Sequence, residues 1–116
     1  MPDFILLLHR PAGAPPALSP EQISAVTREY KDWGDRLRGE GRLKGGEKLT
    51  FDAGRVMRSA GGRIAVIDGP FAKSKELLGG FFVIAARDYD EACDIAESCP
   101  HFKYGGGIEV RQIDVM

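Results

Sequence analysis

Residues 68–82 read DGPFAKSKELLGGFF, and this stretch carries the densest fold information in the chain. Two glycine-bearing turns, four charged side chains and the start of an apolar strand follow one another within it. Asp68 ends one predicted strand, and Phe81 begins another that runs to Ala86. Such a density of turn and strand signals indicates a structured corner rather than a simple connection.

Upstream, the sequence predicts a long helix at about 20–38. Ser19 can cap the free amides of its first turn, Pro20 suits the first helical position, and Gln22 completes a capping box. The apolar residues that follow recur at spacings of three and four, which makes one helical stripe. These residues are Ile23, Val26, Tyr30, Trp33 and Leu37.

Strands are predicted on both sides of that helix. Residues 3–9 show little alternation, so we expect a central strand that is covered on both faces. In residues 43–51 the period is two, which places Glu47 on the same face as Leu43, the face expected to be buried. A hairpin is predicted next, and its turn is Gly61-Gly62. The strands after the helix are 43–51, 55–60, 63–68, 81–86 and 107–113.

A second helix is predicted to begin at Asp88, which can cap it, and to end before Pro100. Cys93 and Cys99 lie six residues apart on this helix, too far for a disulfide on a straight helix. We therefore expect two reduced, packed thiols and a cytoplasmic location. The buried stripe is expected to consist of Ala92, Ile95, Ala96 and Cys99.

The predicted order is strand, long helix, strand, two hairpin strands, strand, helix, strand. This order favours an α+β class with both helices on one face of the sheet, for which a ferredoxin-like sandwich is the simplest solution. The other face would stay bare, and two copies that pack these faces together would cover it, so we expect a homodimer. No repeat or linker appears, so residues 1–116 are expected to form a single domain.

Composition excludes several classes of function. The formal net charge of -1 offers no electrostatic footprint for nucleic acid. The apolar run Phe4–Leu8 is far shorter than the ~20 residues of a membrane span, and Asp3 before it argues against a secretory signal. We expect no metal, because the two histidines and two cysteines lack zinc spacing. We also expect no cofactor, since Gly105–Gly107 lacks the context of a dinucleotide loop.

Three motifs of the chain resemble the YCII-related family, in its DGPF branch. The first runs from Leu37-Arg38 to Gly45-Gly46-Glu47-Lys48-Leu49, the second is residues 68–82, and the third is 99–111, which reads CPHFKYGGGIEVR. Together with the element order they cover nearly the whole chain. The resemblance implies a dimeric α/β barrel of ferredoxin-like subunits with a cleft between them. Lys73 departs from the family pattern, which has an acidic residue there, and we leave it out of the site.

Three residues are candidate catalysts, and each has a structural alternative. Glu47, on a buried strand face, is either a general acid/base or half of an ion pair that holds the sheet register. Asp68 either caps the amides of its own turn or takes part in catalysis. His101 is either a proton shuttle at neutral pH or a partner of the last carbonyls of the second helix.

Four further residues are candidates for substrate binding. Lys75 and Glu76 are adjacent on a predicted turn, where one would face the cleft and the other solvent. Lys75 or Arg111 would hold an anionic group, and Phe71 would line the site unless it only packs the turn. His9, at the end of the first strand, cannot be matched to the histidine that some YCII-related branches pair with an aspartate.

These residues favour a small-molecule acid–base enzyme that works without metal, such as an isomerase or lyase. The alternative is a non-catalytic module that binds a small metabolite or a transcription regulator, because members of this family are often encoded beside sigma factors. A third reading is that the polar residues only hold a dimer together. We expect the candidate catalysts to meet near a mostly apolar dimer cleft.

Overall fold

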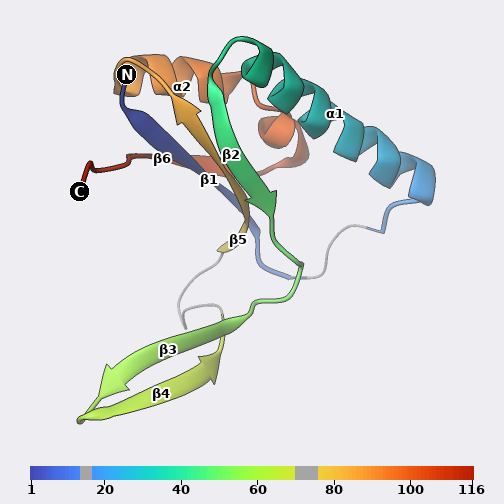
Figure 1. The fold of residues 1–116 in the computed structure, drawn as a ribbon. Coiled ribbons are helices and arrows are strands. Elements are labelled where there is room, and N and C mark those ends of the chain that lie inside the picture. The colour runs from blue at the N-terminus through green and yellow to red at the C-terminus, as the bar shows by residue number, and fades with distance from the viewer. Residues whose placement is uncertain (14–16, 70–75) are drawn as a thin grey trace.

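The computed structural model describes residues 1–13, 17–69 and 76–116. Figure 1 shows a four-stranded antiparallel sheet with two helices on one side of it, and a separate hairpin below. The strand order is β2-β5-β1-β6, which is compatible with a ferredoxin-like fold. The elements are β1 Asp3–Pro11, α1 Pro20–Gly39, β2 Leu43–Lys48, β3 Arg55–Ala60, β4 Arg63–Asp68, β5 Glu76–Ala85, α2 Tyr89–Glu97, the 3-10 helix η1 Pro100–Tyr104, and β6 Gly107–Gln112.

The predicted helix starts are confirmed. The Ser19 hydroxyl accepts a hydrogen bond from the Gln22 amide at 3.1 Å, and the Gln22 side chain accepts one from the Ser19 amide at 2.8 Å. Asp88 caps α2 in the predicted way, with its carboxylate 2.9 Å from the Glu91 amide. Each cap gives a partner to an amide that the helix itself cannot satisfy.

The core lies between the sheet and the two helices. From β1 it takes Phe4, Leu6 and Leu8, which alternate with half-buried neighbours. From α1 only the second half of the predicted stripe is buried, because the first turns extend beyond the sheet and leave Ile23 52% exposed. The other buried members of this core are Trp33, Leu37, Ile84, Ala86, Ala92, Ala96 and Cys99.

The helices cover only one face of the sheet. The expectation that β1 is covered on both faces is therefore wrong for the single chain: Ile5 and Leu7 are half-buried and face away from the helices. The smallest dimension of the molecule is 18 Å, the thickness of one sheet and one helix layer. We call the uncovered surface the open face. Its centre is apolar and consists of Ile5, Leu7, Phe81 and Val83.

A bulge changes the expected orientation of β2. The pairing of β2 with β5 shifts between Leu43 and Gly45, so one extra residue is accommodated there. Beyond the bulge Glu47 pairs with Phe81 and lies on the open face, where it is exposed. The expectation that Glu47 shares a buried face with Leu43 is wrong, because a one-residue slip exchanges the two faces of a strand.

Three other expectations need correction. Strand β5 begins at Glu76 rather than Phe81, so Glu76 lies on a strand paired with Pro11 and not on a turn. Strand β2 ends at Lys48. Cys93 is exposed rather than packed, whereas Cys99 lies beyond α2 and is buried as expected.

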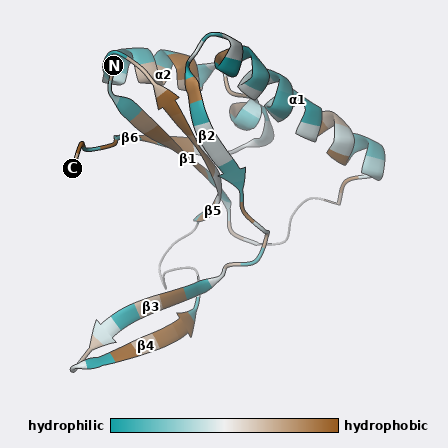
Figure 2. Ribbon diagram, in the orientation of Figure 1, coloured by the Kyte–Doolittle hydropathy of each residue, from teal (hydrophilic) through white to brown (hydrophobic). Residues whose placement is uncertain are grey.

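The hairpin of β3 and β4 has the predicted strands and turn, but it forms a two-stranded sheet of its own. Figures 1 and 2 show it standing away from the main sheet, with brown apolar segments along both strands. The radius of gyration is 16.1 Å, whereas a compact chain of this length has about 13 Å. The projecting hairpin accounts for this extended shape.

Substitution of Gly46 should test the close approach of β2 and β5. A Cβ at Gly46 would lie 2.6 Å from the Phe81 carbonyl oxygen and 2.8 Å from the Phe82 ring, whereas one at Gly45 would meet nothing within 4 Å. We expect Gly46→Ala to lower the free energy of unfolding by about 1–3 kcal/mol in urea titrations. Gly45→Ala is the matched control and should lower the free energy of unfolding clearly less. An equal decrease in both variants would contradict this packing.

Thiol labelling should distinguish the two cysteines. Burial raises the pKa of Cys99 from 9.0 to about 11, so in the folded chain only the exposed Cys93 should react rapidly at neutral pH, and Cys99 only after unfolding. The raised pKa also contributes stability that is complete below about pH 9 and is lost as the pH rises through 11. Cys99→Ala should remove the part of the stability loss at alkaline pH that this thiol causes, as measured by denaturation at a series of pH values. Two equally fast thiols would contradict the buried position.

Candidate functional site

The open face carries a connected group of ionisable side chains at one edge. His9 Nε2 lies 3.1 Å from Glu109 Oε1, and Glu109 Oε2 lies 3.7 Å from an Arg111 guanidinium nitrogen. One carboxylate thus joins an imidazole to a guanidinium. The His9 side chain is 28% exposed, so the ring is partly shielded from water but still accessible.

The sheet register explains why these residues meet. His9 pairs with Gly107, and Leu7 pairs with Glu109, so residues that are 100 positions apart stand on adjacent strands. Alternation on β6 directs Ile108 and Val110 toward the core, and Glu109 therefore points to the open face. Gly107 has no side chain beside His9, and the position of a Cβ there would be 3.9 Å from Glu76 Oε2. A second carboxylate therefore reaches this end of the face.

Glu47 stands on the same face but not in the same group. It occupies a row with Phe81, Leu7 and Glu109, at the opposite edge strand. Three strand spacings separate Glu47 from Glu109, on the order of 14 Å. Within the described ranges the Glu47 side chain makes no ion pair or hydrogen bond with another residue, although its backbone pairs with Phe81.

His101 lies on the other side of the sheet and has structural partners. Its Nε2 donates to the backbone oxygen of His9 at 2.7 Å, because a carbonyl only accepts, and in the neutral ring Nδ1 then accepts from the Tyr30 hydroxyl at 2.9 Å. The ring is 8% exposed, and a Cβ at Gly106 would lie 2.1 Å from it. His101 thus joins α1, η1 and the end of β1, and it fixes the backbone of His9.

Asp68 lies outside both of these groups. It is the last residue of β4, its side chain is 87% exposed, and it pairs with Arg55 across the hairpin at 3.2 Å. The single chain does not bring Glu47, Asp68 and His101 together. The predicted binding residues Phe71 and Lys75 fall outside the described residues.

Sequence reasoning therefore missed the pair of His9 and Glu109. The sequence held one part of the signal: on the last strand the alternation of apolar residues sets Glu109 and Arg111 apart from Ile108. This alternation gives the face of Glu109 but not its neighbour on the first strand. The pairing depends on the register, which the sequence did not provide.

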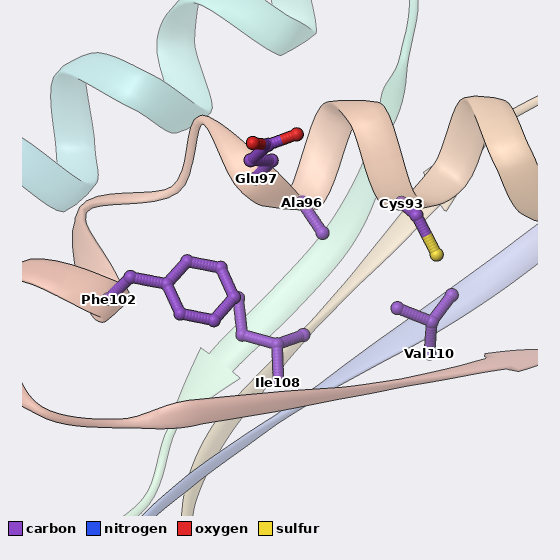
Figure 3. Close-up of a pocket in the computed structure, with 6 residues that line it drawn as sticks. All are labelled: Cys93, Ala96, Glu97, Phe102, Ile108 and Val110. Carbon is purple, nitrogen blue, oxygen red and sulfur yellow. The ribbon is translucent and has the colours of Figure 1, made fainter.

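A cavity also lies elsewhere, between α2, η1 and β6 (Figure 3). It measures about 270 Å³ and is mainly apolar, with Phe102, Ile108 and Val110 as its walls and Cys93 at one side. It belongs to the helix side of the sheet and contains none of the predicted site residues. No group of His, Cys, Asp or Glu side chains suited to a metal ion occurs among the described residues. No described helix is long and apolar enough to cross a membrane.

Removing the Tyr30 hydroxyl should test the role of His101. Burial raises the pKa of Tyr30 well above its ordinary value, so the hydroxyl stays a donor to Nδ1 at neutral pH. Tyr30→Phe should lower the free energy of unfolding by about 1–2 kcal/mol, because it leaves a buried acceptor without a partner. In ¹H–¹⁵N spectra the His9 amide should also shift. Tyr104→Phe, an exposed tyrosine that donates to Glu29, is the control and should leave the His9 amide unmoved.

The chain has relatives among known proteins. Residues 3–116 match the YCII-related domain. The chain is also similar to an uncharacterized protein, R00369, of Rhizobium meliloti (strain 1021), with 36% identity over 92 residues that cover 78% of this chain and 69% of that protein. The domain match covers nearly the whole chain and therefore shows the family. The chain belongs to the YCII-related family.

Proposed function

We propose that this protein is a metal-independent acid–base enzyme of small organic molecules, of the isomerase or lyase type, in the DGPF branch of its family. The observation that carries the proposal is the pairing of His9 Nε2 with Glu109 Oε1 at 3.1 Å on an open, half-apolar sheet face. An imidazole that is held by a carboxylate and partly shielded from water is the usual arrangement of a general base.

Each member of the group takes a role in this proposal. If Nε2 donates its hydrogen to Glu109, the other ring nitrogen of His9 is left with a lone pair that can remove a proton from a substrate. Glu109 stabilises the imidazolium that then forms, and the same nitrogen can return the proton at a neighbouring atom. Arg111, at 3.7 Å from the second oxygen of Glu109, can hold an anionic substrate group nearby.

A second copy of the chain is part of this proposal. Ile5, Leu7, Phe81 and Val83 form an apolar centre that the helices leave half-exposed, and contiguous patches of this kind mark association surfaces. Two open faces packed together, in the manner of a dimeric α/β barrel, would enclose a partly dry chamber. Glu47, far from His9 in its own chain, would then bring its carboxylate toward the His9 of the second copy.

The site residues predicted from the sequence have different parts in this proposal. Glu47, Glu76 and Arg111 lie on the open face and are proposed to line the chamber. The catalytic roles predicted for Asp68 and His101 stay predictions, and His101 has a positioning role toward His9 in addition. A cytoplasmic location is proposed from the two free thiols.

Proton exchange offers a test that does not need the natural substrate. The protein is incubated in D₂O with a panel of 2-oxo, 2-hydroxy and 3-oxo acids, and ¹H NMR follows the loss of the protons on the carbon next to a carbonyl or carboxyl group. We expect wild-type protein to catalyse exchange in at least one of them, and His9→Gln and Glu109→Gln to lower the rate by about 10²-fold or more. Glu29→Gln, on α1 and away from the open face, is the control and should exchange normally.

Two results would decide against the enzyme. Unchanged exchange in both His9→Gln and Glu109→Gln would remove these residues from the chemistry. Saturable binding of an acid without exchange would favour the alternative, a ligand-binding or regulatory module associated with sigma-factor-dependent transcription.

A further inference from the structure

Arg10 is a half-buried cation without a carboxylate beside it. Arg42, the other half-buried guanidinium of the described chain, is paired with the Glu91 carboxylate at 2.5 Å. No carboxylate of the described residues pairs with Arg10, and the remaining residues, 14–16 and 70–75, include no Asp or Glu. A charge that is partly removed from water is normally balanced by an opposite charge. The single chain therefore leaves the charge of Arg10 without a counterion.

Arg10 lies on the helix side of the sheet, at the end that the helices do not cover. Strand β1 directs Leu8, its last buried residue, to the core, and Arg10 follows two residues later on the same face. Leu8 pairs with Gly80, and Gly80 pairs with Lys48, so Lys48 lies on this face as well. Figure 1 shows that the first turns of α1 extend away from this end of the sheet. Both cations are therefore accessible to a small ligand.

The ring of Phe51 brings these two cations together. The Arg10 guanidinium carbon lies 4.6 Å from the centre of this ring, and Lys48 Nζ lies 5.0 Å from it. Arg10 Nη2 donates to the backbone oxygen of Phe51, and Nη1 donates to that of Pro11 at 3.4 Å. Lys48 Nζ donates to the backbone oxygen of Leu49 at 3.5 Å. These contacts hold both side chains in place, but a ring and a carbonyl carry no net charge, so neither cation is neutralised.

The pair of cations matches an anion that carries more than one negative charge. Lys48, like Arg10, has no carboxylate partner in the described ranges. A phosphate monoester carries a charge of about -1.5 to -2 at neutral pH, with several strong acceptor oxygens. The planar fork of an arginine suits two of these oxygens, and a lysine supplies a further point charge. The guanidinium and ammonium N–H groups that no backbone oxygen uses can donate to such a group.

We propose that Arg10 and Lys48 form a binding site for the phosphate group of a small ligand, beside the ring of Phe51. The bound group joins the end of β1 to the segment that follows β2, because Arg10 and Phe51 come from these two places. The site lies on the face of the sheet opposite His9 and Glu109. It therefore goes beyond the proposed function and does not depend on it.

Titration with phosphate tests the site. Inorganic phosphate or glycerol 3-phosphate replaces chloride at pH 7.5 and constant ionic strength, and ¹H–¹⁵N spectra follow the amide of Gly79, where a Cβ would lie 3.7 Å from the Arg10 side chain. We expect saturable shifts. Arg10→Gln and Lys48→Gln should each raise the dissociation constant about tenfold, because each removes one charge-assisted contact.

Lys44→Gln is the matched control. It removes the same charge from another exposed lysine of β2, one that has no ion pair in the described part of the chain. It should leave the dissociation constant unchanged, and circular dichroism should confirm that all variants fold. The two ligands distinguish the sources of the phosphate group. Tighter binding of glycerol 3-phosphate supports the site with an organic phosphate as its ligand, and tighter binding of inorganic phosphate supports it with the free ion.

Three results would overturn the site. The first is a set of shifts that do not saturate with either ligand. The second is an equal dissociation constant in wild type and Arg10→Gln. The third is a Lys44→Gln variant that weakens binding as much as Lys48→Gln does, because general attraction between the protein and an anion would then explain the shifts.

Discussion

The central position of β1 determines most of this structure. It pairs with β5 on one side and with β6 on the other, so its side chains from Phe4 to His9 have neighbours on both flanks. Its alternation sends Phe4, Leu6 and Leu8 under the helices and Ile5, Leu7 and His9 to the open face. The hydrophobic core and the candidate site therefore lie on opposite sides of the same strand.

The site also depends on the helix layer through β1. His101 donates to the backbone oxygen of His9, and Tyr30 donates to His101, so a chain of hydrogen bonds runs from α1 through the core edge to the strand that carries His9. Buried polar groups that are fully paired in this way make a structure rigid and specific. The imidazole of His9 is thus attached to a backbone position that is fixed both by the sheet and, through His101, by the helix layer.

Local signals predicted the elements well. The capping box at Ser19, the turn at Gly61-Gly62 and the helix start at Asp88 each act within a few residues, so the sequence alone reveals them. The sequence alone could not predict the face of the sheet on which Glu47 lies, because a single bulged residue in β2 reverses that face. The site was harder still: the partner of His9 is set by the register of two strands that are 100 residues apart. His101 illustrates the same limit, since its burial comes from α1 and from the missing side chain of Gly106.

The irregularity at the end of β1 restricts how this protein can change in evolution. Leu8 pairs with Gly80 and His9 with Leu78, so β5 accommodates one extra residue, Gly79, opposite that step. Loss of Gly79, or insertion of a single residue nearby, would move every following side chain of the strand to the opposite face of the sheet. Insertions and deletions among related sequences should therefore lie mostly in the connections between elements. Inside these strands they should involve two residues at a time, or be accompanied by a second bulge in the neighbouring strand.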